Sequence, residues 1–263
     1  MHGILAAAAI LLFATMTASC ATAPEPAAMD PAEATWQDFL DKRRELRNEI
    51  RAIDVKSSIN LNTPERKTRL IINFWGNLDY PLRLDLTTGF GAPVAYSRED
   101  GLGFTAYDPN SQTAYLSENS RRGAKILGLT MPFDLKDLAS LAAGTFLDLL
   151  PENYTRAEPA DTGGWKYHFG EKSEVSAAVL NPGGRLSALS GAGEKGPWVM
   201  VLKDYAENTP YGESRPEKLV FRAGEDVKAI LRIKDMRRMA EAWPEESLEL
   251  PLPPGTRTKI LEP

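Results

Sequence analysis

Cysteine and histidine are scarce in this sequence of 263 residues, which contains only Cys20, His2 and His168. A single cysteine cannot close a disulfide within the chain, and so few ligands exclude a histidine–cysteine metal cluster. His168 alone would have to serve any catalytic triad, and no Gly-x-Ser-x-Gly nucleophile motif occurs. We therefore expect no metal, no cofactor and no enzymatic activity.

One glycine-rich segment has the letters of a cofactor site. Gly191–Gly196 (GAGEKG) fits the dinucleotide fingerprint G-x-G-x-x-G. That motif functions only where it opens a helix whose N-terminus faces the pyrophosphate. Here it precedes residues 198–204, which we expect to form a strand. The segment is therefore interpreted as a hairpin turn.

The sequence also lacks a run of basic residues, and its formal net charge is -5. This argues against nucleic acid as a partner, and against binding anionic lipid headgroups by charge alone. Hydrophobic content of 43% and charged content of 25% are ordinary for a globular protein. A core of normal size is therefore possible without disulfides or metals.

The amino terminus has the features of an export signal. The apolar run Ile4–Phe13 is too short to span a bilayer, and small residues, Thr17–Ser19, stand immediately before Cys20. This arrangement resembles the lipobox of bacterial lipoproteins, in which the cysteine is acylated and becomes the new amino terminus. We predict a signal peptide over residues 1–19 and lipid attachment at Cys20. The alternative is an ordinary cleaved signal that leaves a free cysteine.

A tether and a helix are expected next. Ala21 stands where an aspartate commonly retains lipoproteins in the inner membrane, which favours the outer membrane. Residues 20–34 are rich in proline and poor in large apolar residues, so we expect a flexible tether. From Thr35 an amphipathic helix of about five turns is predicted. Its apolar face contains Trp36, Phe39, Leu40, Leu46, Ile50 and Ile53, and its polar residues include Asp38, Lys42, Arg43, Glu45 and Glu49.

The hydrophobic period then changes to two, which predicts antiparallel strands. They are expected at 55–61, 70–74, 82–86, 94–96, 104–107 and 114–116, and again at 165–169, 175–180, 185–189, 198–204, 218–222 and 229–233. Between the two sets, Ser120–Leu127 and a segment from Asp134 to Gly144 are predicted to be helical. The proline-rich segment from Trp243 onward is expected to stay outside the fold.

These elements predict a mainly β protein with helices (α+β) and about nine to eleven strands. A sheet of that size curls, and its concave face must be covered, so the N-terminal and mid-chain helices are the expected lids. The apolar side chains that alternate along two neighbouring strands are expected to form the concave wall of the sheet. These are Leu70, Ile72, Phe74, Leu82, Leu84 and Leu86.

The stretch from Trp75 to Phe146 resembles the outer-membrane lipoprotein receptor family LolB. Leu82–Gly91 is similar to the family's leucine-rich strand, which leads into a tight loop with a protruding apolar residue before a glycine. Leu127–Phe133 and Leu138–Gly144 are similar to the segment Gly-x-x-(I/L)-Pro-(L/V) and the closing glycine that follow in the family. The resemblance assigns one LolB-like domain to residues 35–235 and a proline-rich C-terminal tail to 236–263.

The resemblance implies a curved antiparallel half-barrel with helices over its mouth and an apolar cavity inside. Such a protein would act as a monomer at the periplasmic face of the outer membrane. It would accept the acyl chains of lipoproteins from a periplasmic LolA-like carrier and help to insert them in that membrane. Phe90, between Gly89 and Gly91, would enter the bilayer. The alternative is that its ring folds back on the core.

A second function of another class is compatible with the same sequence. A structural or assembly lipoprotein could use this fold to hold a protein partner in envelope or polysaccharide export. The cavity distinguishes the two, because a receptor needs a large, apolar and reachable one, whereas a scaffold can fill it with side chains.

Overall fold

The computed structural model describes residues 29–64, 67–126, 131–171, 173–193, 196–206, 215–225 and 227–261. In these residues the chain forms fourteen strands, more than the nine to eleven expected. The helices are α2 (Pro31–Glu49), α3 (Ser120–Ile126), α4 (Leu135–Ala143) and the 3-10 helix η1 (Glu245–Leu248). The strands are β1 (Ala52–Asn62), β2 (Lys67–Asn77), β3 (Leu82–Thr88), β4 (Pro93–Asp100), β5 (Gly103–Asp108), β6 (Thr113–Ser117), β7 (Arg156–Pro159), β8 (Trp165–His168), β9 (Val175–Leu180), β10 (Leu186–Gly193), β11 (Gly196–Ala206), β12 (Arg215–Ala223), β13 (Val227–Met239) and β14 (Arg257–Ile260).

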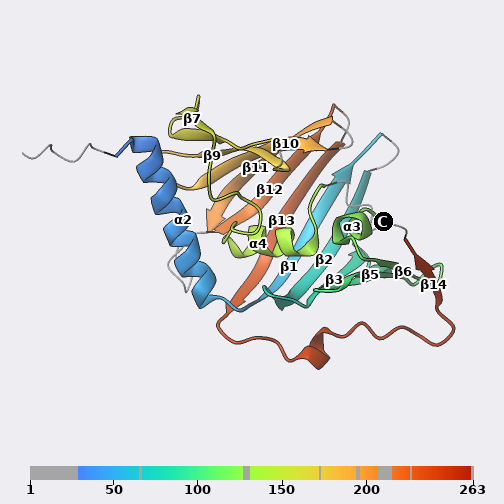
Figure 1. The fold of residues 1–263 in the computed structure, drawn as a ribbon. Coiled ribbons are helices and arrows are strands. Elements are labelled where there is room, and N and C mark those ends of the chain that lie inside the picture. The colour runs from blue at the N-terminus through green and yellow to red at the C-terminus, as the bar shows by residue number, and fades with distance from the viewer. Residues whose placement is uncertain are drawn as a thin grey trace, which may run out of the picture.

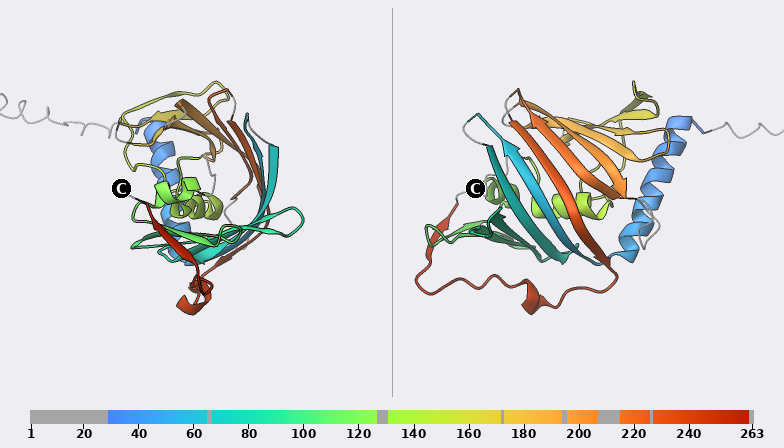
Figure 2. Two further views of the ribbon diagram at one scale, coloured as in Figure 1. Left: turned by 90° about the vertical axis from the view of Figure 1, so that its right-hand side faces the viewer. Right: turned by 180° about the vertical axis from the view of Figure 1, so that it is seen from behind.

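All of these strands belong to one curved sheet, in the order β14-β6-β5-β4-β3-β2-β1-β13-β12-β11-β10-β9-β8-β7. Neighbours are antiparallel except β14, which runs parallel to β6. Strand β1 pairs with both β2 and β13 and thereby joins the first half of the chain to the second. Figure 1 shows helix α2 along one side of the sheet, and Figure 2 shows α4 inside its curve. Among the described residues, no helix combines the length and apolar character needed to cross a membrane.

Two strands occupy segments in which the sequence pattern predicted none. The edge strand β7 contains no buried residue, and β14 is exposed at every position. Neither segment therefore has the alternation of apolar and polar residues by which the other strands were predicted. The extra strands form at the two ends of the sheet, where backbone hydrogen bonding alone can add them.

Helix α2 begins inside the segment that was expected to be a tether. The Asp30 side chain accepts a hydrogen bond from the Ala32 amide at 2.8 Å, and Pro31 occupies the first turn. Both features start a helix, so it begins before Thr35. It ends at Glu49, and Ile53, expected on its apolar face, belongs to β1 instead.

Trp36 fixes α2 against the β7–β9 end of the sheet. Its ring lies 4.6 Å from that of Tyr167 and 5.5 Å from that of Phe39, between ring centres. Its indole N–H donates to the Glu152 carbonyl at 2.7 Å. The side chain is fully buried, so the helix closes this end of the sheet and forms part of the main core.

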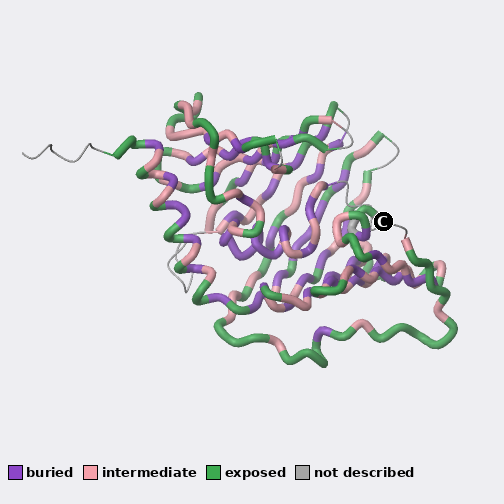
Figure 3. Tube along the Cα trace, in the orientation of Figure 1, coloured by how far each residue is buried: buried purple, intermediate pink, exposed green. Residues whose placement is uncertain are grey.

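The C-terminal tail packs against the fold, and the expectation that it stays outside is wrong. Trp243 donates its indole N–H to the Ile53 carbonyl at 3.1 Å, and Leu248 is fully buried. Arg98 donates to the Leu248 carbonyl at 3.1 Å, and Arg83 donates to a carbonyl of the same segment. The tail then returns to the sheet as β14, although most of its residues remain exposed (Figure 3).

Candidate functional site

An apolar cavity lies between the concave face of the sheet and helix α4. Its lining comes from strands on both sides of β1 and from the helix that covers them: Val55, Ser57, Ile59, Ile72, Phe74, Leu84, Met131, Leu138, Ala142, Leu219, Leu231 and Ile233. Ser57 supplies a hydroxyl and every other lining side chain is apolar. The free space is about 30 Å³, roughly the share of liquid volume that one water occupies.

The six side chains predicted to form the concave wall are all buried. Ile72, Phe74 and Leu84 line the cavity, whereas Leu70, Leu82 and Leu86 are buried on the same face without lining it. The structure thus places the wall where alternation suggested. Whether acyl chains bind there stays a prediction.

Helix α4 is held in place at its N-terminus by a capping box. Asp134 accepts from the Asp137 amide at 2.8 Å, and Asp137 accepts from the Asp134 amide at 3.3 Å. The buried carboxyl of Glu99, on β4, accepts from the Leu135 amide at 2.7 Å and from the Tyr80 hydroxyl at 3.0 Å. Burial, with a smaller effect of Asp134, raises the pKa of Glu99 to about 7.

The other end of α4 is held by Arg43. This side chain is only 5% exposed, and it donates to the Gly144 carbonyl, at the C-cap of α4, at 2.9 Å. Its guanidinium lies 5.5 Å from the ring centre of Phe39 and 5.9 Å from that of Phe146. Arg43 was expected on the polar side of α2, and that expectation is wrong, because its side chain is buried. Its spacing from Trp36 and Phe39, seven and four residues, would have placed it on the buried stripe.

The role of Glu99 at the N-terminus of α4 was also not predicted from the sequence. The inward residues Ala95 and Ser97 of β4 continue the alternation to Glu99, and all three are buried. The predicted strand ended at residue 96, so this signal was not followed. A carboxylate at an inward position next to a helix N-terminus is the pattern that could have revealed it.

Phe90 lies at the tip of the β3–β4 turn with its ring fully exposed. The turn is closed by hydrogen bonds from the Thr88 amide to the Ala92 carbonyl at 2.8 Å and from the Gly91 amide to the Thr88 carbonyl at 3.0 Å. Gly91 adopts a φ of 85°, which favours glycine. The ring therefore projects from the fold, and the alternative that it packs on the core is wrong.

Two other sequence assignments have different outcomes. Cys20 lies outside the described residues, so its lipid attachment stays a prediction. The glycine-rich segment joins β10 to β11, which pair up to Gly193 and Gly196, and this confirms a hairpin. A Cβ at Gly191 would meet the Glu174 carbonyl at 2.1 Å and the Trp198 ring at 2.5 Å, so glycine there allows close packing.

Comparisons with known proteins identify the fold. No protein-family model matches the chain, and no curated protein matches it in sequence. Among solved structures, a LolA superfamily protein from Nitrosomonas europaea is 15% identical, with a TM-score of 0.57, over 81% of this chain and 97% of that one. A candidate outer membrane lipoprotein-sorting protein domain from Vibrio parahaemolyticus is 12% identical, with a TM-score of 0.51, over 77% and 93%. A DUF1329 family protein from Desulfovibrio piger is 10% identical, with a TM-score of 0.56, over 84% and 100%.

At these identities the likeness shows the fold alone. The chain has a LolA-like fold, an open, curved and mainly antiparallel sheet with helices on its concave side. The resemblance to LolB is thereby supported as far as this shared fold.

Proposed function

We propose that this protein is an outer-membrane lipoprotein that binds the acyl chains of other lipoproteins and helps to insert them in the outer membrane. Cys20 would carry its anchor on the periplasmic face, and a LolA-like periplasmic carrier would deliver the cargo to a monomer. The lipoprotein-sorting role named for the Vibrio domain is carried over to this chain only as part of this proposal.

The observation that supports it most is the apolar cavity under a helix held at both ends. The aliphatic and aromatic lining matches an acyl chain in polarity, and burial of such a chain contributes roughly 0.8 kcal/mol per methylene. Helix α4 contributes Leu138 and Ala142 to the lining, and its ends are held by Glu99 and Arg43. A ligand that replaced these contacts, together with the packing of the buried Leu135 and Leu141, would displace α4, so α4 is the proposed lid.

A second function is favoured by one specific observation. The free space of about 30 Å³ is far smaller than an acyl chain. A scaffold lipoprotein that holds a protein partner, in envelope or polysaccharide export, would have an interior filled by its own side chains. Acyl-chain binding therefore requires the lining to open, and this requirement is what an experiment must test.

The test is saturable binding of a fluorescent hydrophobic probe to the chain from Ala21 onward, followed by displacement with a lipidated peptide. Ala142→Val adds two methyl groups' worth of volume to the lining and should weaken binding about tenfold, the equivalent of roughly two buried methylenes. Ala188→Val, at a partly exposed position of β10, is the matched control and should bind like wild type. Absence of saturable binding by the folded wild-type chain would favour the scaffold.

A further inference from the structure

Four cations gather on the outer face of the sheet, at the end where the β1–β2 and β12–β13 turns lie. We call Lys67, Arg69, Arg222 and Lys228 the basic rim. Lys67 and Arg69 alternate with the inward Leu70 along β2, and Arg222 and Lys228 alternate with the inward Phe221 and Ala229. Within the described part of the chain, none of the four forms an ion pair, although the exposed Glu225 lies in the β12–β13 turn.

The strand register places these cations side by side. Lys67 pairs with Asn62, Asn62 with Lys228, and Lys228 with Arg222, so one row across four strands holds three cations. Lys228 and Arg222 directly oppose each other, and like charges in that arrangement destabilise a sheet. An anion bound between them would relieve this repulsion.

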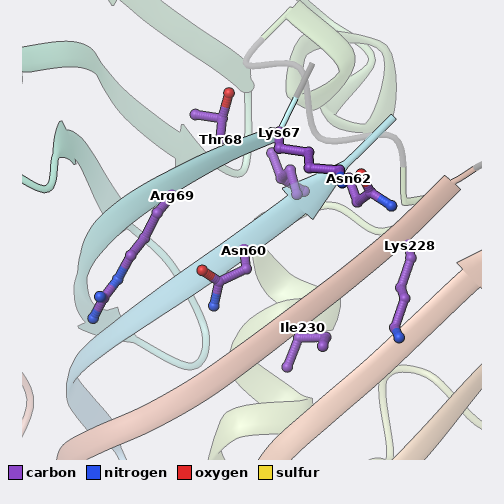
Figure 4. A pocket seen from close by; sticks show the side chains of 8 residues that line it. Asn60, Asn62, Lys67, Thr68, Arg69, Lys228 and Ile230 are labelled. Atoms are coloured by element: carbon purple, nitrogen blue, oxygen red, sulfur yellow. The ribbon is translucent and has the colours of Figure 1, made fainter. Parts of the chain in front are cut away.

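Three members of this row, Lys67, Asn62 and Lys228, line a surface groove. Lys67, Arg69 and Lys228 line it together with the amides of Asn60 and Asn62 and with Ile230 (Figure 4). Ammonium, guanidinium and amide groups all donate hydrogen bonds, and charge-assisted bonds to phosphate oxygens are the strongest of these. The groove therefore fits a phosphate group.

The exposed ring of Phe90 lies at the same end of the sheet. Leu70 pairs with Thr88, so the turn that follows Thr88 extends beyond the end that carries Lys67 and Arg69. A projecting aromatic ring beside a set of cations is typical of surfaces that bind the interface of an anionic membrane. Neither the ring nor the basic rim would be sufficient alone to hold the protein at a membrane, because each contributes only modestly to membrane affinity.

From this juxtaposition we infer that the basic rim binds the phosphate groups of anionic phospholipids and, with Phe90, sets the end of the sheet against the membrane. The inference deepens the proposed function. It rests on that function only for the reason why the protein would contact a membrane. The rim and the cavity are separate surfaces, so the membrane contact and the acyl-chain binding can fail independently.

The experiment measures co-sedimentation of the chain from residue 20 onward, carrying Cys20→Ala, with vesicles. One set is phosphatidylcholine, and the other is equal parts phosphatidylcholine and phosphatidylglycerol. Wild-type rim residues should give stronger binding to the anionic vesicles, and added salt should weaken it. Lys67→Gln with Lys228→Gln should reduce that binding roughly thirtyfold, which is the combined contribution of two cations at an anionic surface.

The matched control is Lys42→Gln with Lys56→Gln, which removes two exposed lysines of α2 and β1 and gives the same net charge. It should bind anionic vesicles like the parent chain. Equal binding to both vesicle types, or equal loss in the rim and control variants, overturns the inference. The hydrophobic probe should bind the rim variant unchanged; if it binds no chain while the rim effect holds, the proposed acyl-chain function fails and the membrane contact stands.

Discussion

Replacing Glu99 tests whether a buried carboxyl holds the N-terminus of α4. Its pKa is about 7 in the folded protein, against an ordinary value of 4.5, chiefly because of burial. The folded chain therefore binds a proton there more tightly than the unfolded chain does. The stabilisation is complete below about pH 4.5, declines as the pH rises toward about 7, and is lost above that value. Wild-type stability should accordingly fall between about pH 5 and about pH 8.

The magnitude follows from that difference in pKa. At about 1.4 kcal/mol for each tenfold change in the ionisation equilibrium, it corresponds to roughly 3 kcal/mol. In Glu99→Gln the amide oxygen can still accept from the Leu135 amide, while the charge is absent at every pH. The variant should thus gain roughly 3 kcal/mol relative to wild type on going from about pH 5 to about pH 8.

Urea unfolding at several pH values measures this difference in stability. The free energy of unfolding is obtained with the same dependence on urea concentration at every pH. Asp137, whose pKa burial also raises to about 7, contributes to the wild-type trend, so the comparison between the two chains is the informative one. Glu118→Gln, at an exposed position, is the control and should follow wild type. If the free energy of unfolding of Glu99→Gln has the same pH dependence as that of wild type, then ionisation of Glu99 is not its cause. The reasoning from the burial of this carboxyl would then be refuted.

Three further outcomes are expected. Cys20→Ala should move the protein from the membrane fraction to the soluble fraction, because stable anchoring needs the acyl chains; persistence in the membrane would contradict the lipoprotein assignment. Phe90→Glu should leave the thermal midpoint unchanged and block delivery of lipoprotein to membranes, while Phe90→Leu keeps delivery; a midpoint lowered by several degrees would mean that the ring stabilises the fold. Trp36→Ala should cost about 3–5 kcal/mol in chemical denaturation, since it empties the contact between α2 and the sheet, and a loss below about 1 kcal/mol would refute that packing.

Alternation along the chain was sufficient to predict most of the sheet. Strands such as β2 and β11 bury one face and expose or partly expose the other, and that pattern is visible in the residues themselves. Strands β7 and β14 bury neither face, so only hydrogen bonding to a neighbour defines them. The tail was misjudged for a similar reason: its prolines suggested separation, whereas carbonyls of residues 247–249 accept hydrogen bonds from Trp75, Arg83 and Arg98.

The candidate site likewise has a part that could be predicted from the sequence and a part that could not. Its apolar wall could be predicted, because burial of alternating leucines follows from the period of two. The groups that hold α4 could not be paired from sequence, since Arg43 lies 101 residues from Gly144 and Glu99 lies 36 residues from Leu135. Contacts of that kind depend on the tertiary arrangement.

The basic rim could not be predicted from composition, because strand pairing brings together cations that are far apart in the sequence. The sequence has no basic run and a net negative charge, and from this we argued against binding of anionic headgroups by charge alone. Its four cations come from three strands, and they become neighbours only when β1 pairs with β2 and β13 and when β13 pairs with β12. The proposed contact combines them with Phe90, so charge does not act alone.

The closed cavity is compatible with an acyl-chain carrier on energetic grounds. Opening the lid would expose the fully buried Leu135 and Leu141 of α4 and break the hydrogen bonds that Arg43 and Glu99 make with its two ends, at about 1.5–3 kcal/mol each. A chain of about ten buried methylenes would contribute roughly 8 kcal/mol, which is comparable to the sum of these losses. A long acyl chain can therefore open the cavity where a short apolar molecule cannot. Probe affinity should accordingly rise steeply with chain length in wild type and be about tenfold lower at each length in Ala142→Val, an outcome that a filled scaffold would not give.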